Sequence, residues 1–489
     1  MRRSTRSLAL LAAAVLTLAM MSPALAHSSQ DDRRGGGPQQ EDRHAEAERD
    51  RRDSRNRTDR DGRDRRARDG RLAFAVNVTH DTVAANIGDG KCADASGQCS
   101  LRAAVQESNA ASSPAVIKLD AKVYQLTIAG AGENEAARGD LDITGDVVVD
   151  GRGATIDAAG LDRAFDVQGG SLWLQKVTLT GGAPSAGEGG GAVRSTGTLS
   201  LKRVHLTANA VTGDGASGGA VLNDGGVLHA EHSEMRNNTA IRAGGAIEAV
   251  AGTTNLDRVV LAENHTGPAP GNGGGLHLTG AGAVTVTNSV VVRNTATAEG
   301  GGLWNSATGT MDVRHSRVNG NVASGGDADQ GGGGLYNDGG LLTVSGGQVK
   351  GNAADGAAGS GGGILNNEGT LVVSSTVIAG NSAKRAGGGI EAVAGTTELD
   401  RVRLAGNNTG PAPGNGGGLH LTGAGAVTVT NSVVVGNTAT AEGGGLWNSA
   451  TGTMTVTHTV IRNNHAPEGP DVYNDGGTFL VDGEPVPIG

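Results

Sequence analysis

Residues 284–296 read VTVTNSVVVRNTA, and this stretch decides the fold. Val284 and Val286 alternate with Thr285 and Thr287, and Thr287-Asn288 forms a polar corner. Beyond the corner, Ser289 and Val291 again keep a spacing of two before the stretch reaches Asn294. Alternation with a period of two over runs this short predicts β-strands rather than a helix. The same frame recurs at residues 311–318, 371–378 and 454–461.

The chain also repeats at a longer interval. An apolar residue, two variable residues and an asparagine recur ten times, at spacings of 26 to 31 residues. A period of about 28 residues predicts a repeat protein in which each unit buries its apolar face only against its neighbours. We expect the asparagines to stack at one buried corner, where each amide donates to and accepts from the next at the ~4.8 Å strand spacing. They are Asn209, Asn238, Asn264, Asn294, Asn321, Asn352, Asn381, Asn407, Asn437 and Asn464.

A Gly-rich run followed by one aliphatic residue, the anchor, keeps the same period from Val193 to Leu446. Three short strands and three turns per unit, with no helical interval, stack most simply as a parallel β-helix, and the crossover rule makes its winding right-handed. We therefore predict an all-β chain in which residues 139–489 form a right-handed parallel β-helix, a solenoid of roughly 12–14 coils. Val472 keeps the spacing but follows Pro470-Asp471 instead of glycines, which predicts a terminal unit that closes the stack.

The N-terminal part differs from these units. Residues 100–110, SLRAAVQESNA, predict a short helix with Ser100 as its N-cap, and this helix would cover the open end of the stack. Cys92 and Cys99 are the two cysteines of the chain. Their close spacing in an exported protein predicts one disulfide, and a metal-binding pair is the weaker alternative because no second Cys or His pair stands nearby.

Residues 1–26 have the features of a secretory signal peptide: an Arg-rich start, an apolar stretch and the small-x-small site Ala24-Leu25-Ala26. Residues 27–71 carry fourteen Arg against twelve Asp plus Glu and almost nothing apolar, which predicts a disordered charged tether. No later segment has enough consecutive apolar residues to span a bilayer. We expect a monomer that is secreted or held at the cell surface, with the periplasm as a second location.

The net charge of −10 becomes −15 when the +3 of the signal peptide and the +2 of the tether are removed. This acidic body argues against nucleic acid as a partner, because phosphate binding requires a cationic face. A polysaccharide or a cell-surface protein is the expected partner.

The stretch from Asp81 to Ala110, DTVAANIGDGKCADASGQCSLRAAVQESNA, resembles the CSLREA domain of secreted bacterial proteins. The motif itself stands at residues 99–104, with Ala103 in place of its glutamate, so residues 72–138 resemble an N-terminal cap of that kind. The downstream units, such as residues 238–247, are similar to the repeats of polymorphic outer membrane proteins. The resemblance implies a right-handed parallel β-helix of the pectin-lyase-like kind, exported and often surface-associated, and it implies no reaction.

One column of residues carries the candidate chemistry. The residue after each anchor is expected to point outward, and neighbouring members are expected to lie one strand spacing apart, ~5 Å. Residues 242–311 and 385–454 match at 64 of 70 positions, so the second half of the column is a copy of the first. The column reads Leu222, Glu248, His277, Trp304, Tyr336, Leu365, Glu391, His420, Trp447 and Tyr473.

This column predicts a saccharide-facing stripe, in which Trp304, Tyr336, Trp447 and Tyr473 would bind. Glu248 with His277, or its copy Glu391 with His420, are the weak catalytic candidates, because a carboxyl beside an imidazole can transfer protons. The two glutamates would lie ~24 Å apart, too far for the ~5–9.5 Å that glycoside hydrolysis requires.

Neighbouring Glu and His side chains on exposed strands are usually solvated, so we favour a non-enzymatic exported β-helix that serves as a surface or extracellular, adhesin-like binding scaffold. The alternative is a polysaccharide lyase or a glycoside hydrolase that uses the stripe.

No metal or cofactor site is predicted. Asp327 and Asp329, in the Gly-rich loop of residues 325–334, are a weak candidate for calcium. A flexible acidic loop is the better interpretation, because the nonapeptide calcium repeat is missing.

Overall fold

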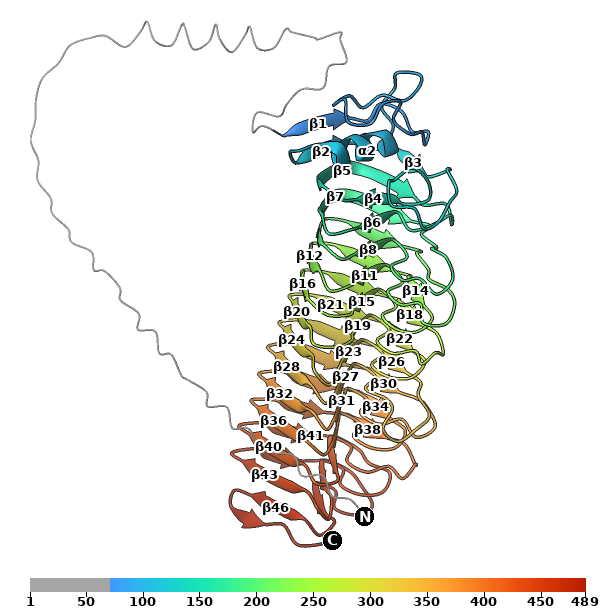
Figure 1. Cartoon of the computed structure of the whole chain (residues 1–489). Helices are drawn as coiled ribbons and strands as arrows, with labels where there is room; N and C mark the ends of the chain where they lie inside the picture. Colours follow the sequence, from blue (N-terminus) through green and yellow to red (C-terminus); the bar gives the residue numbers. More distant parts are fainter. Residues whose placement is uncertain (1–70) are drawn as a thin grey trace, which may run out of the picture. The chain divides into compact units, whose positions relative to one another are not determined.

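The computed structural model describes residues 71–489, so the predicted signal peptide and nearly all of the predicted tether lie outside the described residues. The described chain is a parallel β-helix whose coils stack along one axis (Figure 1). Its strands form three sheets, of 27, 13 and 7 strands. The second sheet takes one strand from each coil, so its thirteen strands lie within the predicted range of roughly 12–14 coils. Within residues 71–489, no helix is both long and apolar enough to cross a bilayer.

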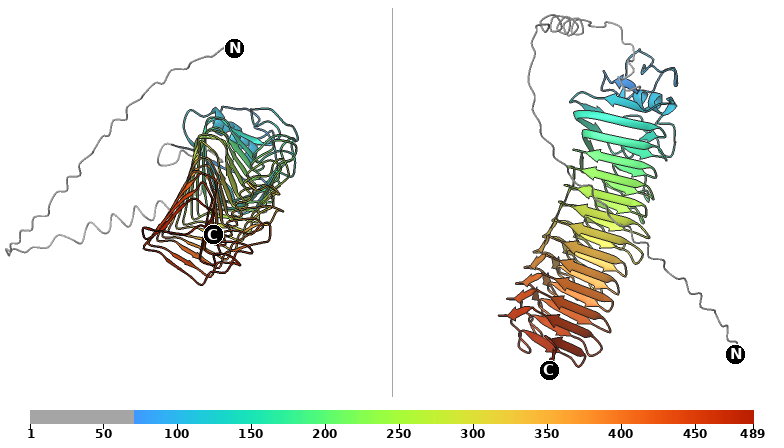
Figure 2. Two further views of the ribbon diagram at one scale, coloured as in Figure 1. Left: turned by 90° about the horizontal axis from the view of Figure 1, so that it is seen from below. Right: turned by 90° about the vertical axis from the view of Figure 1, so that its left-hand side faces the viewer.

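The first sheet consists of two columns of parallel strands, which β5 and β7 join by running through both (Figure 2). Its longer strands form the first column, and an antiparallel partner, β47, covers β46 at the C-terminal end. The strands of the first column are β1 (Leu72–Ala75), β2 (Ala115–Lys118), β5 (Asp146–Asp157), β7 (Ser171–Thr180), β9 (Thr198–Lys202), β12 (Val227–Glu231), β16 (Thr253–Asp257), β20 (Ala283–Thr287), β24 (Thr310–Arg314), β28 (Leu341–Ser345), β32 (Thr370–Ser374), β36 (Thr396–Asp400), β40 (Ala426–Thr430), β43 (Thr453–Thr457), β46 (Thr478–Val481) and β47 (Glu484–Pro485). Those of the second column are β3 (Val123–Gln125), β10 (His205–Thr207), β13 (Glu234–Arg236), β17 (Val260–Ala262), β21 (Val290–Val292), β25 (Arg317–Asn319), β29 (Gln348–Lys350), β33 (Val377–Ala379), β37 (Arg403–Ala405), β41 (Val433–Val435) and β44 (Val460–Arg462).

The second sheet carries the anchors, and the third consists of two-residue strands that follow the asparagines. The sequence predicted three strands per unit, and this third sheet makes a fourth; two residues are too few to show a period. The second sheet contains β4 (Leu141–Ile143), β6 (Phe165–Val167), β8 (Val193–Ser195), β11 (Val221–Asn223), β15 (Ile247–Ala249), β19 (Leu276–Leu278), β23 (Leu303–Asn305), β27 (Leu335–Asp338), β31 (Ile364–Asn367), β35 (Ile390–Val393), β39 (Leu419–Thr422), β42 (Leu446–Asn448) and β45 (Val472–Asn474). The third contains β14 (Thr239–Ala240), β18 (His265–Thr266), β22 (Thr295–Ala296), β26 (Val322–Ala323), β30 (Ala353–Ala354), β34 (Ser382–Ala383) and β38 (Asn408–Thr409).

The asparagine ladder is confirmed. All ten asparagines are at most 4% exposed, and the Nδ2 of Asn264, for example, donates to the Oδ1 of Asn294 at 2.9 Å. The same Oδ1 also accepts from the backbone N–H of Asn264 at 3.0 Å. At the C-terminal end, Asp471 replaces the next asparagine and accepts from the Nδ2 of Asn464 at 2.8 Å. The terminal unit therefore satisfies the last amide of the ladder, which would otherwise be a buried donor without an acceptor.

The N-terminal cap is built as predicted around α2 (Leu101–Ala110), whose N-cap Ser100 accepts from the backbone N–H of Ala103 at 3.0 Å. The helix packs on β2, β4 and β5. The Cys92–Cys99 disulfide is present. Because β1 and β2 pair in the same sheet as β5, residues 72–138 and 139–489 form one continuous structure.

Candidate functional site

The register of the second sheet brings the predicted column together. Glu248 lies opposite His277, His277 opposite Trp304, and Trp304 opposite Tyr336. The corresponding residues Glu391, His420, Trp447 and Tyr473 pair in the same order. The predicted adjacency of these side chains is therefore confirmed.

The predicted exposure of the column was wrong. Glu248 is 1% exposed, His277 3%, Trp304 8% and Tyr336 2%, and of the eight candidate residues only Tyr473 is half-buried. Gly-rich loops of the same coils cover the column: the indole Nε1 of Trp304 donates to Glu299, and the hydroxyl of Tyr336 donates to the backbone oxygen of Asp329. An exposed column requires water on the outer side of these strands, whereas the loops between the third and second sheets fold over it.

The Glu–His pair forms a closed polar network. The Nδ1 of His277 lies 3.0 Å from the Oε2 of Glu248, and the hydroxyl of Thr279 donates to the Oε1 of Glu248 at 2.7 Å. Arg242 lies 3.5 Å from that same Oε1. Burial acts to raise the pKa of Glu248, but His277, Thr279 and Arg242 outweigh it and hold the pKa below its ordinary value. The carboxylate is therefore already paired inside the protein.

The aromatic members stack on one another. The ring centroids of His277 and Trp304 lie 4.2 Å apart at an interplanar angle of 18°, and those of Trp304 and Tyr336 lie 6.0 Å apart at 7°. In the second copy the corresponding distances are 4.1 Å and 6.3 Å. These stacks occupy the ring faces that a sugar would contact, so Trp304 and Trp447 are packing residues in this structure.

The column begins further upstream than predicted. Before Leu222 it contains Asp142, Asp166 and Arg194, which lie opposite one another in β4, β6 and β8. The rule that places the candidate residue one position after the anchor also finds these three residues. Asp142 and Asp166 were missed because no Gly-rich run precedes Leu141 or Phe165 in the first, irregular coils. Arg194 follows the predicted anchor Val193 but was not included in the predicted column.

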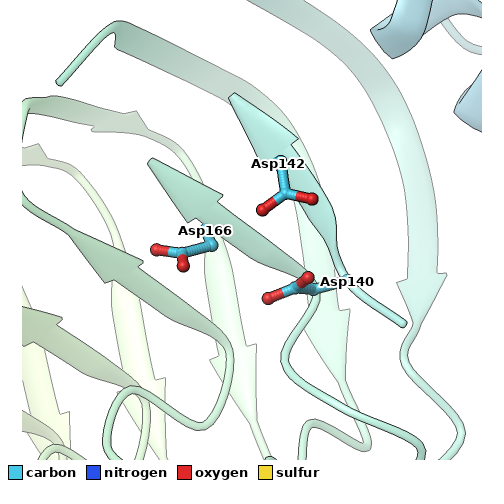
Figure 3. A group of neighbouring side chains, drawn as sticks. All are labelled: Asp140, Asp142 and Asp166. Carbon is cyan, nitrogen blue, oxygen red and sulfur yellow. The ribbon is translucent and has the colours of Figure 1, made fainter. Parts of the chain in front are cut away.

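Asp140, just before β4, joins Asp142 and Asp166 in a buried acidic cluster (Figure 3). One carboxylate oxygen of each lies within 4.8 Å of the other two. The Nη1 of Arg163 lies 3.0 Å from the Oδ2 of Asp140 and 3.6 Å from the Oδ2 of Asp166. Burial raises the pKa of Asp140 to about 8 and that of Asp142 to about 7, because a carboxylate without water is costly.

This cluster is the group within residues 71–489 whose donors suit a metal ion. Three carboxylates without histidine or cysteine suit a hard cation such as Ca²⁺. Asp327 and Asp329, the predicted weak calcium candidates, are exposed and find no third ligand in the described chain.

Comparison with protein-family models, with curated proteins and with solved structures gave no match for this chain.

Proposed function

We propose that this chain is an exported, non-enzymatic scaffold that binds a polysaccharide, or a cell-surface protein, through the outer face of its first sheet. The observation that carries this proposal is a surface groove of about 310 Å³ on β12, β16 and β20. The proposal that the protein lies at the cell surface or outside the cell is supported by the signal-like first residues and by the resemblance to secreted β-helix proteins.

The groove is made of two polar rows that the register holds in place. His229, Asn255 and Thr285 lie opposite one another, and so do Glu231, Asp257 and Thr287. The rows present imidazole, amide, hydroxyl and carboxylate groups at the strand spacing of ~4.8 Å. Sugar hydroxyls both donate and accept hydrogen bonds, so such a mixed row suits them. A stacked sheet is already rigid, which lowers the cost of ordering the site on binding.

The burial of the Glu–His pairs supports binding over catalysis. A general acid or base must come within hydrogen-bond reach of the substrate, directly or through one water. Glu248 and Glu391 are at most 1% exposed and are already bonded to His277 and His420. The lyase or hydrolase alternative would require the covering loops to open.

Binding can be tested on a glycan array and on intact cells with the full chain. Replacing Asn255 and Thr285 by alanine is expected to weaken binding about tenfold, which corresponds to about 1.4 kcal/mol. The matched control replaces Glu398 and Thr428, which stand at the same places on β36 and β40. A control that weakens binding equally would show that the groove is not the site, and a chain that binds neither glycans nor cells would contradict the proposal.

Catalysis has a separate test. The full chain is incubated with acidic and neutral polysaccharides, and sugar or uronate release is measured. We expect no release. Release that disappears when Glu248→Gln and Glu391→Gln are combined would replace the binding proposal with the enzymatic one.

A further inference from the structure

We propose that Asp140, Asp142 and Asp166 hold one Ca²⁺ ion, which links the N-terminal cap to the first coils of the β-helix. This inference does not depend on the function proposed above. It rests on the geometry, the unmatched hydrogen-bonding capacity and the charge of the cluster.

The spacing of the carboxylate oxygens in the cluster lies within the span of a Ca²⁺ coordination shell. Ca²⁺ binds oxygen at about 2.3–2.6 Å, so two of its ligands can lie as far apart as ~5 Å. The three oxygens of the cluster lie within 4.8 Å of one another. Asp142 and Asp166 come from adjacent strands, so the backbone register fixes their separation.

Asp166 supplies a second, independent observation. Its side chain is buried, at 5% exposure for the residue, and its Oδ1 has no hydrogen-bond partner. Its Oδ2, by contrast, lies 3.6 Å from Arg163 and 3.8 Å from Arg194, and it accepts from the Nε2 of Gln168 at 3.4 Å. The same Nε2 donates to the Oδ1 of Asp142 at 2.8 Å. An unsatisfied carboxylate oxygen inside a protein is costly, and coordination to a cation removes that cost.

The charges of the cluster do not balance. The guanidinium of Arg163 interacts with five carboxylates. One further cation, Arg194, reaches Asp166 but also pairs with Asp224 at 3.2 Å. One divalent cation would offset part of this excess negative charge, which is costly to leave unpaired inside a protein. The carboxylates around Arg163 are Asp140, Asp142, Asp162, Asp166 and Glu188.

The position of the cluster explains what the ion would link. The buried side chain of Arg102, on α2, donates to the backbone oxygens of Gly139 and Asp140 at 2.8 Å and 3.1 Å. The Oδ2 of Asp142 accepts from the backbone N–H of Ala136 at 2.8 Å. Coils of a solenoid contact only their neighbours, so a cross-link at this point secures the junction between cap and coils.

The test uses the full chain after treatment with a chelator, titrated calorimetrically with CaCl₂ and, separately, with MgCl₂. We expect one Ca²⁺ per chain, weaker binding of Mg²⁺, and an unfolding temperature that rises by several degrees with excess Ca²⁺. Asp166→Asn and Asp142→Asn are each expected to weaken Ca²⁺ binding at least tenfold. Asp224→Asn, the control on the neighbouring strand end, is expected to change it less than twofold.

Hydrogen exchange provides a readout on the unaltered protein, should both variants fail to fold as judged by circular dichroism. Ca²⁺ is expected to slow amide exchange most strongly in residues 133–168. No heat of Ca²⁺ binding to the wild-type chain, protection centred elsewhere, or binding that is lost instead in Asp327→Asn combined with Asp329→Asn, would overturn the proposal.

Discussion

The two copied blocks, residues 242–311 and 385–454, place the same side chains in the same register but are followed by different coils. After the first block, Tyr336 is 2% exposed and packs in a cluster with Trp304 and Leu365. After the second, Tyr473 is half-buried, because β45 is the last strand of the second sheet. The environment of a side chain in this solenoid therefore depends on the following coil as well as on its own sequence.

Contacts within the blocks are nearly identical. The indole nitrogen of Trp304 lies 3.0 Å from Glu299, and that of Trp447 lies 2.9 Å from Glu442. Each histidine Nδ1 lies 3.0 Å from the Oε2 of its glutamate partner. Matched substitutions in the two blocks therefore isolate the effect of the surrounding coils.

The largest effect is expected in the asparagine ladder. Asn294→Ala leaves the backbone N–H and the Nδ2 of Asn264 without their acceptor, and it removes the donor to the backbone oxygen of Leu261. At about 1–3 kcal/mol for each unsatisfied group, the local loss is roughly 5 kcal/mol. Asn437→Ala removes the matching bonds one block later.

Hydrogen exchange distinguishes the two ladder variants. Because coils are held only by their neighbours, Asn437→Ala is expected to release mainly the coils beyond residue 400, whereas Asn294→Ala should loosen coils on both sides of residue 294. Equal and global loosening in both variants would show that the rod unfolds as one unit.

Trp304→Ala and Trp447→Ala compare the aromatic stacks. Each truncation of a buried tryptophan costs about 3–5 kcal/mol, and the first variant should lie at the high end because its neighbour Tyr336 is fully enclosed. Chemical unfolding of both variants gives the comparison. A larger loss for Trp447→Ala would contradict the dependence on the following coil.

The pH dependence of stability is expected to include a contribution from Glu299. Burial raises the pKa of Glu299 to about 7, from an ordinary value of 4.5. Between these values the unfolded chain releases the proton while the folded chain keeps it, so stability falls as pH rises through this window and levels off above it. The effect of Glu299→Gln on the free energy of unfolding should therefore be more favourable at pH 8 than at pH 5, by roughly 2 kcal/mol.

Urea unfolding at the two pH values measures this difference, and Glu442→Gln is the matched control. An effect of Glu299→Gln that is the same at both pH values would contradict the role of the buried carboxyl.

The smallest effect is expected where the copies themselves differ. Val260 is half-buried and its counterpart Arg403 is exposed, both on the outer face of the second column of the first sheet. Exchanging them, as Val260→Arg and Arg403→Val, should change the free energy of unfolding by about 0.5 kcal/mol or less. A loss above about 1 kcal/mol in thermal or chemical unfolding would mean that this face is covered.

Much of the fold could be predicted because it is written in short-range patterns. Alternation marked the strands of the first sheet, the Gly-rich anchors marked the second, and Ser100 marked the start of α2. The third sheet was not predictable in this way. Its strands are two residues long, and what holds them is pairing between coils rather than an intrinsic preference of their residues.

The candidate site was predicted only in part. Adjacency within the column follows from the strand spacing, so the pairing of Glu248 with His277 could be inferred from residue numbers alone. The covering of the column by loops could not, because glycine-rich segments carry no pattern that shows which way they fold. The acidic cluster also escaped, since Asp140, Asp142 and Asp166 are joined by coils of irregular length.

Periodicity in the chain was thus enough to establish that this protein is a stacked parallel β-helix with an asparagine ladder, because each coil repeats the same local rules and contacts only its neighbours. Which side chains reach water was decided only by the folded structure. Burial depends on where the loops between sheets lie, and those positions result from packing across coils that no single unit of sequence specifies.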